Sequence, residues 1–200
     1  MIFKVCGITN QGDADAAIAA GANAIGFNFY PSSPRHIAPQ AAAAIDTAPG
    51  VRRVGVFVNE PRERVEAIAR AARLDVAQLH GDESAAIFPA GIAVWKAARV
   101  AGPFDISVYD RLPAEALVLD GPAGELYGGA GTTFDWNLAA PSTRRIILAG
   151  GLDASNVARA IAIARPWGVD ACSRIESAPG IKDHQKMIDF LQAAKAALLS

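Results

Sequence analysis

Residues 115–120 read Glu-Ala-Leu-Val-Leu-Asp, a short apolar run that ends on a carboxylate. A run of this length and composition predicts a buried β-strand. An isolated carboxylate is costly to bury, so we expect Asp120 either to be paired or to lie at an open end of the sheet. The segment therefore predicts a strand that delivers one polar group to the edge where the strand ends.

Similar runs recur along the chain and alternate with Ala-rich segments of helical periodicity. The predicted strands are residues 2–6, 23–28, 53–58, 75–79, 93–98, 115–120, 145–149 and 168–172. The predicted helices are residues 12–20, 38–47, 61–73, 83–88, 153–164 and 183–198, and the segments after the fifth and sixth strands are expected to be short or irregular. Eight βα units in one domain, residues 1–200, close most economically into a parallel (β/α)8 (TIM) barrel. A doubly wound open sheet is the alternative, although its G-x-G-x-x-G fingerprint does not follow the first strand.

Composition and charge limit the partners that we expect. The 200 residues include 19 basic and 20 acidic side chains, a formal net charge of -1, which gives no long-range field suited to nucleic acid or an anionic membrane. No apolar stretch approaches the roughly 18 residues of a membrane helix. The two cysteines, Cys6 and Cys172, lack the spacing of a zinc site or a disulfide framework, which favours a reducing cytoplasm. We therefore expect a cytoplasmic protein, a monomer rather than a dimer, with neither nucleic-acid nor membrane partners.

A TIM barrel builds its active site from the C-terminal ends of its strands and the loops that follow them. Cys6 ends the first predicted strand and Asp120 ends the sixth. These two strands lie across the barrel from each other, so the two side chains are placed to flank one ligand. The alternative for Cys6 is structural, because cysteine is a small residue that is often buried without any function.

Glycine clusters follow the last three predicted strands and indicate an anion site. A single glycine after a strand is often only a turn residue. Together, however, they let backbone N–H groups approach a phosphate, and the loops after strands seven and eight are the usual phosphate site of this fold. We expect a phosphorylated small molecule to bind here. The candidate binding residues are Gly129, Gly131, Gly150, Gly151, Ser173 and Arg174.

Longer blocks of sequence carry a resemblance to a known family. These blocks are KVCGIT at 4–9, GFNFYPSSPRHI at 26–37, GVFVN at 55–59, QLHGDE at 78–83, LVLDG at 117–121, GGAGTTFDW at 128–136, LAGGLDASNV at 148–157 and GVDACSRIESAPGIKD at 168–183. In this order and spacing the chain closely resembles the phosphoribosylanthranilate isomerases of tryptophan biosynthesis. The resemblance implies a (β/α)8 barrel and a cofactor-free Amadori rearrangement of N-(5-phosphoribosyl)anthranilate to the corresponding 1-deoxyribulose 5-phosphate.

The resemblance also assigns roles to three residues. Cys6 is implied to be the general base that removes the C2 proton, and Asp120 the general acid that protonates the ring oxygen. Because free Cys and Asp have pKa values of about 8.5 and 3.9, the site must favour the thiolate and raise the pKa of the carboxyl. Arg35 is implied to lie near the anthranilate carboxylate, which a guanidinium can bind through two parallel hydrogen bonds. A solvated loop arginine is the alternative.

The three histidines and one aspartate have less specific signals. His80 is either a barrel-mouth histidine with satisfied hydrogen bonds or a neighbour of the substrate. We expect His36 and His184 to be surface residues. Asp135 is expected to cap the short helix after the sixth strand rather than to take part in chemistry.

The seam between the first and eighth strands predicts an ion pair. The side-chain period of two places Lys4 with Cys6 on one strand face and Asp170 with Cys172 on the other strand's face. Neither charge is expected to stand unpaired on a barrel strand, so Lys4 and Asp170 should form a buried pair.

Two positions depart from the pattern of the family that the chain resembles. Cys172 stands where the family usually has Ser, and Arg174 stands where it usually has Gly. Because positive φ at an arginine is strained, we expect a right-handed helical turn here, with the backbone N–H groups of Ser173 and Arg174 facing the phosphate. The Arg174 side chain either folds back onto the phosphate or extends into solvent, and we expect solvent.

Two other functional classes compete with this interpretation. A different phosphosugar isomerase on the same fold, such as that of histidine biosynthesis, would be expected to carry Asp where this chain has Cys6. A barrel that only binds a phosphate ligand would keep the glycine loops without needing both Cys6 and Asp120. Fold alone does not separate these classes.

Overall fold

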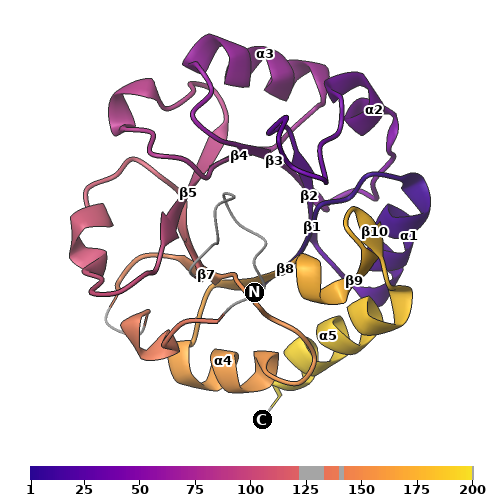
Figure 1. Cartoon of the computed structure of the whole chain (residues 1–200), viewed down its shortest axis with the longest axis vertical. Helices are drawn as coiled ribbons and strands as arrows, with labels where there is room; N and C mark the ends of the chain where they lie inside the picture. The colour runs from indigo at the N-terminus through magenta and orange to yellow at the C-terminus, as the bar shows by residue number, and fades with distance from the viewer. Residues whose placement is uncertain (122–132, 140–141, 200) are drawn as a thin grey trace.

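The computed structural model describes residues 1–121, 133–139 and 142–199, and it contains a closed barrel of eight parallel strands in sequence order (Figure 1). The strands are β1 (Ile2–Cys6), β2 (Ala24–Asn28), β3 (Arg52–Phe57), β4 (Val76–Leu79), β5 (Ala93–Arg99), β6 (Ala116–Asp120), β7 (Ile146–Leu148) and β8 (Gly168–Ala171). The β1–β8 pairing closes the barrel, with Lys4 opposite Asp170. The predicted fold class is confirmed, and each strand lies within two residues of its expected bounds.

A ring of helices surrounds the strands, as Figure 1 shows. It comprises α1 (Gln11–Ala20), α2 (Pro39–Ala44), α3 (Arg62–Ala71), α4 (Val157–Ala164) and α5 (His184–Ala196). Single 3-10 turns occupy η1 (Ala85–Ile87), η2 (Ile106–Tyr109), η3 (Trp136–Leu138) and η4 (Ser173–Ile175). The expectation of short or irregular structure after the fifth strand is confirmed by η2, and the described residues after the sixth strand hold the short turn η3. A small hairpin of β9 (Glu176–Ala178) and β10 (Ile181–Lys182) follows η4.

The helix predicted at residues 83–88 is wrong, because only the three residues of η1 are helical. Glu83 is buried, and its side chain is held by loop residues. Its carboxylate accepts hydrogen bonds from the backbone N–H groups of Asn59 at 2.8 Å and Gly81 at 3.1 Å. Pro89 then disfavours helical geometry at Phe88, which is extended. Residues 83–88 therefore form a loop with a single 3-10 turn instead of a helix.

Two predicted helices are shorter than expected for similar reasons. Before α4, the Asp153 carboxylate accepts from the N–H of Ser155 at 2.9 Å, so residues 153–156 form a side-chain-capped turn and the helix begins at Val157. At the end of α2, Ile45 is extended, and the Arg53 guanidinium donates to the carbonyl of Ala42 at 2.6 Å, an end group that a longer helix would use.

The core has two layers that follow the alternation of each strand. In β6, Leu117 and Leu119 pack outward in the large cluster beneath the helices, whereas Ala116 and Val118 belong to the cluster inside the barrel. The same period of two directs Asp120 toward the barrel axis. Polar groups therefore replace apolar ones at the C-terminal end of the barrel interior. Among the described residues, the structure contains no helix that is long and apolar enough to span a membrane.

Candidate active site

Cys6 occupies the inward face of β1, one alternation beyond Lys4, and its thiol is nearly buried at 8% exposure. Gly26, its partner on β2, makes room for it: a Cβ atom there would lie 2.7 Å from the Cys6 sulfur and 3.1 Å from Lys4 Cε. Any larger residue on this part of β2 would displace the thiol. The local packing thus holds Cys6 at the inner rim of the barrel.

The surroundings of Cys6 favour its thiolate. The Cys172 thiol donates a hydrogen bond to the Cys6 sulfur, which lowers the pKa of Cys6, and the positive charges of Lys4 and Lys182 lower it further. Burial acts in the opposite direction, but the net effect places this pKa well below that of an ordinary thiol. The expected environment for a basic Cys6 is therefore present.

Asp120 ends β6 with 7% exposure and contacts a histidine that directly follows β4. His80 Nε2 lies 3.1 Å from Asp120 Oδ2, and His80 Nδ1 lies 3.2 Å from the Gln78 amide nitrogen. Because the amide donates to Nδ1, Nε2 carries the hydrogen of the neutral ring and donates to the carboxylate. Both ring nitrogens of His80 thus have protein partners, which agrees with the first of its two predicted roles.

Arg35 is held by a buried carboxylate rather than extended into solvent. Its Nε and Nη2 atoms donate to Glu176 at 2.8 to 3.2 Å, a bidentate pair. Lys182 Nζ contacts the same carboxylate at 2.7 Å, and these three side chains are at most 12% exposed. Burial raises the pKa of Glu176, but Arg35 and Lys182 outweigh it and hold that pKa below the ordinary value. The arginine is therefore fixed at the rim of the barrel beside Cys172.

The hairpin of β9 and β10 covers the loop that carries Arg35. A Cβ atom at Gly180, whose φ is +82°, would lie 3.3 Å from the Pro34 carbonyl oxygen. The Thr9 hydroxyl donates to the Gly180 carbonyl at 2.7 Å. Segments that follow β1, β2 and β8 are thus tied together on one side of the barrel mouth.

The glycines after β7 have a structural requirement that the sequence did not reveal. Gly150 has φ +78°, and a Cβ atom there would lie 2.7 Å from Asp120 Oδ1 and 2.4 Å from the Gly121 nitrogen. Gly151 follows with φ +64°. Gly150 therefore allows this loop to pack directly against the candidate acid. The other two candidate glycines, Gly129 and Gly131, lie outside the described residues.

The turn after β8 has the expected backbone but an unexpected ion pair. Ser173–Ile175 forms the right-handed turn η4, and Arg174 does not have positive φ. Its side chain is exposed, as expected, and it also forms an ion pair at the surface: Nη2 lies 2.8 Å from Asp153 Oδ2. From the sequence we considered only solvent or phosphate as surroundings of the Arg174 side chain. We did not consider Asp153, because this contact joins two loops whose residues lie 21 positions apart.

The remaining sequence predictions concern residues away from the thiol and carboxylate. Asp135 caps η3, with its carboxylate accepting from the Asn137 N–H at 3.1 Å, as expected. His36 is exposed, and His184 is half-exposed with Nε2 2.8 Å from Asp13 Oδ1. Both are surface residues. Among the described residues, no group of three His, Cys, Asp or Glu side chains is arranged to hold a metal ion.

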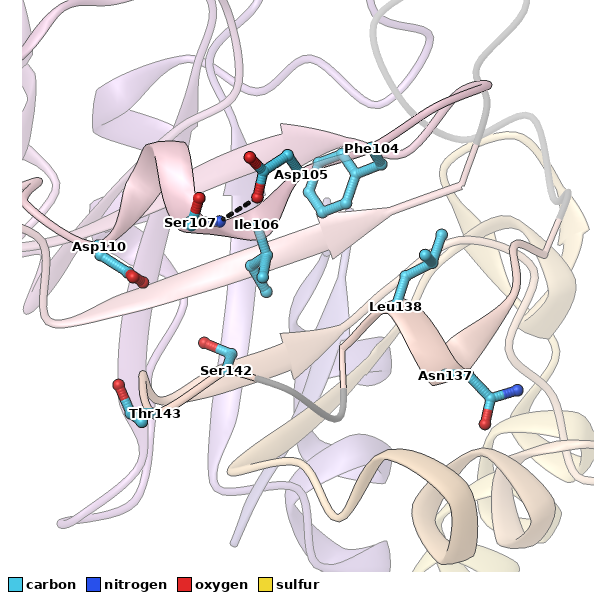
Figure 2. Close-up of a pocket in the computed structure, with 9 residues that line it drawn as sticks. All are labelled: Phe104, Asp105, Ile106, Ser107, Asp110, Asn137, Leu138, Ser142 and Thr143. Carbon is cyan, nitrogen blue, oxygen red and sulfur yellow. Dashed lines mark hydrogen bonds between the residues drawn. The ribbon is translucent and has the colours of Figure 1, made fainter.

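A cavity of about 400 Å³ lies elsewhere, in the outer layer between η2 and η3 (Figure 2). Phe104, Ile106 and Leu138 line its apolar part, and Asp105 bends back to accept from the Ser107 N–H at 2.9 Å. Its walls include none of the candidate site residues.

Sequence reasoning missed three residues of the site. Gly26 begins the segment GFNFYPSSPRHI at 26–37, but only the register of β1 on β2 shows that it accommodates Cys6. Glu176 and Lys182 are charged residues in a loop, and such residues are usually solvated. Their common signal is an acid and a base six residues apart around Pro179 and Gly180, which is typical of a hairpin that brings them together.

Comparisons of the sequence and of the structure with known proteins all find similarity to the same group of enzymes. The family model described as N-(5'-phosphoribosyl)anthranilate (PRA) isomerase matches residues 3–193. The chain is 73% identical over 198 residues to the N-(5'-phosphoribosyl)anthranilate isomerase of Solibacter usitatus, covering 99% of each chain. It is similar to the crystal structure of phosphoribosyl anthranilate isomerase from Thermus thermophilus, with TM-score 0.90 and 40% identity over 98% of this chain and 99% of that one. A phosphoribosyl anthranilate isomerase in complex with reduced 1-(o-carboxyphenylamino)-1-deoxyribulose 5-phosphate is also similar, with TM-score 0.86 and 38% identity over 98% and 100% of the chains.

Proposed function

The chain belongs to the N-(5'-phosphoribosyl)anthranilate isomerase family of tryptophan biosynthesis, and we propose that it performs this isomerisation with Cys6 as general base and Asp120 as general acid. The observation that carries the proposal is the placement of a thiol with a lowered pKa and a carboxyl group on β1 and β6, strands on opposite sides of one barrel. An aldose to ketose rearrangement needs one proton donor and one proton acceptor around the same sugar.

The two proton transfers follow from this arrangement. The Asp120 carboxyl gives a proton to the ribose ring oxygen as the bond between that oxygen and C1 breaks, which opens the ring to a protonated imine. The Cys6 thiolate then takes the proton from C2, and the electron pair of that C–H bond forms the enolamine. Tautomerisation of the enolamine gives the 1-deoxyribulose product.

His80 and Gly150 are proposed to orient the acid. His80 donates to Oδ2 of Asp120, so that oxygen is already occupied. The other oxygen, Oδ1, lies along the Gly150 loop. We assign the transferable proton to Oδ1, since this assignment leaves the hydrogen bond from His80 intact during the transfer.

Arg35 is proposed to bind the anthranilate carboxylate. Glu176 engages Nε and Nη2, so among contacts with described residues Nη1 remains for a ligand. A guanidinium fixed by one carboxylate loses little conformational entropy when it binds a second. The relative solved with a carboxyphenylamino ligand binds a molecule of this chemistry.

The phosphate is proposed to bind between the loops after β7 and β8. Gly151, Ser173 and Arg174 would present backbone N–H groups there, in the position that this fold commonly uses for phosphate. Gly129 and Gly131 are retained as candidate contacts from the sequence. The substrate partner is thus a small phosphoribosyl compound, and we propose that no cofactor is needed.

We further propose a monomeric, cytoplasmic enzyme. Both cysteines are free thiols, as is usual in a reducing compartment. Among the described residues, the exposed large apolar side chains are Ile87, Val108, Ile181, Leu198 and Leu199, which, apart from the last two, lie on separate elements. Light scattering coupled to size-exclusion chromatography tests the oligomeric state, and a mass of twice 20.8 kDa would contradict it.

The direct test is a coupled assay with freshly formed phosphoribosylanthranilate. The purified wild-type chain should convert it to the deoxyribulose product, whereas Cys6→Ala and Asp120→Asn should not do so at a comparable rate. Binding of a reduced product analogue to both variants would show that their sites still fold. Turnover near that of wild type in either variant would remove that residue from its role.

A further inference from the structure

The two cysteines of the chain meet at the seam between β1 and β8. The last register pair of this seam is Val5 opposite Ala171, so the next residues are Cys6, which ends β1, and Cys172, which directly follows β8. Cys6 lies on the same face of β1 as Lys4, and the side chains of Lys4 and Asp170 already touch across the seam at 2.7 Å. Neighbouring parallel strands lie about 4.8 Å apart. A disulfide tolerates Cα separations of about 4.4 to 6.8 Å, so the backbone here suits one.

The positions of the sulfur atoms agree with this geometry. A Cβ atom at Gly7, the residue directly after Cys6, would lie 3.1 Å from the Cys172 sulfur. The Cys172 sulfur therefore lies close to the backbone that directly follows Cys6. Both thiols are free, Cys6 is 8% exposed and Cys172 is partly exposed. A small reagent can thus reach the pair from the barrel mouth.

We propose that Cys6 and Cys172 form a dithiol site that hydrogen peroxide or an alkyl hydroperoxide converts into an intramolecular disulfide. The formation of this bond rests on the geometry of the seam alone. The consequence that the enzyme stops turning over rests on the proposed function, because the disulfide removes the thiolate of the general base. Reduction by a dithiol would restore both thiols.

The chemistry proceeds in two balanced steps. The Cys6 thiolate attacks one peroxide oxygen, the O–O bond breaks, and water or an alcohol leaves after taking up a proton, which produces the sulfenic acid. The Cys172 thiolate then attacks the Cys6 sulfur, the S–S bond forms, and the S–O bond breaks. Before this attack the Cys172 thiol gives its proton to the Glu176 carboxylate, and the departing hydroxide takes up that proton and leaves as water. Two electrons pass from the sulfur pair to the peroxide.

Neighbouring cations assist both steps. Lys4 is fully buried next to Cys6, and Lys182 Nζ lies 3.9 Å from the Cys172 sulfur. Positive charge favours the Cys6 thiolate, whose pKa lies well below the ordinary value. The hydrogen bond to Cys6 and burial raise the pKa of Cys172, and the charge of Lys182 opposes that rise. Glu176 Oε1 lies 4.0 Å from the Cys172 sulfur and can accept its proton transiently. The seam therefore provides an attacking sulfur, a resolving sulfur and the charges that activate them.

The test measures thiols as well as activity. Wild-type enzyme is treated with hydrogen peroxide, and free thiols, intact mass and non-reduced peptide maps are recorded before and after addition of dithiothreitol. Because the chain has only two cysteines, the expected result is loss of both thiols, a mass lower by two hydrogens and a Cys6–Cys172 cross-linked peptide, all reversed by dithiothreitol. Sulfinic acid at Cys6 with Cys172 still free, or two intact thiols, would overturn the proposal.

A variant without the second thiol and a reagent that binds two thiols at once test the dithiol site independently of the peroxide reaction. Cys172→Ser retains Cys6 but should form no cross-link and should proceed irreversibly to the sulfinic acid. Phenylarsine oxide bonds two thiols at once and needs no variant: it should form a one-to-one adduct with wild type that dithiothreitol, but not a monothiol, removes. Failure to form this adduct would argue against the dithiol geometry.

The outcomes separate this inference from the proposed function. A reversible disulfide with unchanged turnover would leave the dithiol site intact and exclude Cys6 as the base. Absence of a disulfide together with an inactive Cys6→Ala variant would leave the catalytic role intact and exclude the dithiol site.

Discussion

Lys4 Nζ lies 2.7 Å from Asp170 Oδ2 across the seam that closes the barrel. The period of two along adjacent strands predicts this buried pair, and the structure confirms it. Burial lowers the pKa of Lys4, but the charges of Asp170 and Cys6 outweigh it and raise that pKa, so Lys4 stays protonated. A permanent cation therefore lies beside the candidate base.

The first prediction concerns this cation. In a Cys172→Ser background, Lys4→Met should raise the pKa of Cys6, because the variant lacks the nearby positive charge that favours the thiolate. The rate of alkylation by iodoacetamide, measured against pH, reports this pKa directly. Asp170→Asn added to Lys4→Met avoids an unpaired buried carboxylate and serves as the folding control. An unchanged midpoint would show that Lys4 is only structural.

Features that depend on local periodicity could be predicted from the sequence, whereas features that depend on contacts between distant residues could not. Strand positions and the Lys4–Asp170 pair depend on local periodicity and on the closure of the barrel, and both can be derived from the sequence. The Arg35–Glu176 pair joins residues 141 apart through two loops, so its geometry appears only after folding. The helix predicted at 83–88 is wrong because the long-range contacts of Glu83 outweigh its local helix propensity.

The second prediction assigns the two proton transfers. Cys6→Ala and Asp120→Asn should each lower kcat by at least about a hundredfold, the lower range of a general acid or base contribution, with KM little changed. Steady-state kinetics with phosphoribosylanthranilate measures both constants. Gly26→Ala gives a packing comparison, because it crowds the Cys6 thiol while retaining it. A large KM effect with kcat intact would indicate that a residue binds substrate instead.

The third prediction is a bell-shaped pH dependence of kcat/KM. Activity should rise with pH as Cys6 loses its proton, and it should fall at higher pH because the mechanism also needs a proton donor. Since the pKa of Cys6 is lowered, the rising limb should lie below the value of about 8.5 for an ordinary thiol. The falling limb should disappear from the residual activity of Asp120→Asn. Persistence of both limbs in that variant would contradict the assignment of the acid.

The fourth prediction tests Glu176 as the positioning residue for Arg35. Glu176→Gln should raise KM and, because it leaves two buried cations uncompensated, lower the free energy of unfolding by about 3 kcal/mol near neutral pH. The lowered pKa of Glu176 means that its contribution is present above the ordinary value near 4.5 and is lost as pH falls through the folded value. The variant should therefore lose less stability on acidification than wild type.

Glu115 offers the matched control for this fourth prediction. It precedes β6 at the opposite end of the barrel and pairs with Arg52 at 2.8 Å. Burial raises the pKa of Glu115, but hydrogen bonds from Arg52 and Trp95 outweigh this effect, so the pKa is lowered overall. Glu176 shows the same balance with its own partners. Glu115→Gln should thus alter stability without changing KM. An equal KM effect in both variants would remove Glu176 from its positioning role.

The last prediction concerns the arginine that departs from the family pattern. Arg174 pairs with Asp153 at 2.8 Å, and the two residues lie on the loops where the phosphate is proposed to bind. We interpret the guanidinium as neutralising Asp153, whose carboxylate would otherwise repel the phosphate. Arg174→Gly should raise KM by less than tenfold, about 1.4 kcal/mol, since a half-exposed pair contributes little.

The double variant Arg174→Gly/Asp153→Asn distinguishes neutralisation from direct binding. If Arg174 only neutralises Asp153, removing both charges should return KM to near the wild-type value, and the single-variant defect should shrink with added salt. If the guanidinium binds the phosphate itself, the double variant keeps the full defect, because the lost contact is not replaced. A rise in KM of tenfold or more that Asp153→Asn does not relieve would therefore show that Arg174 binds the phosphate directly and overturn the neutralisation account.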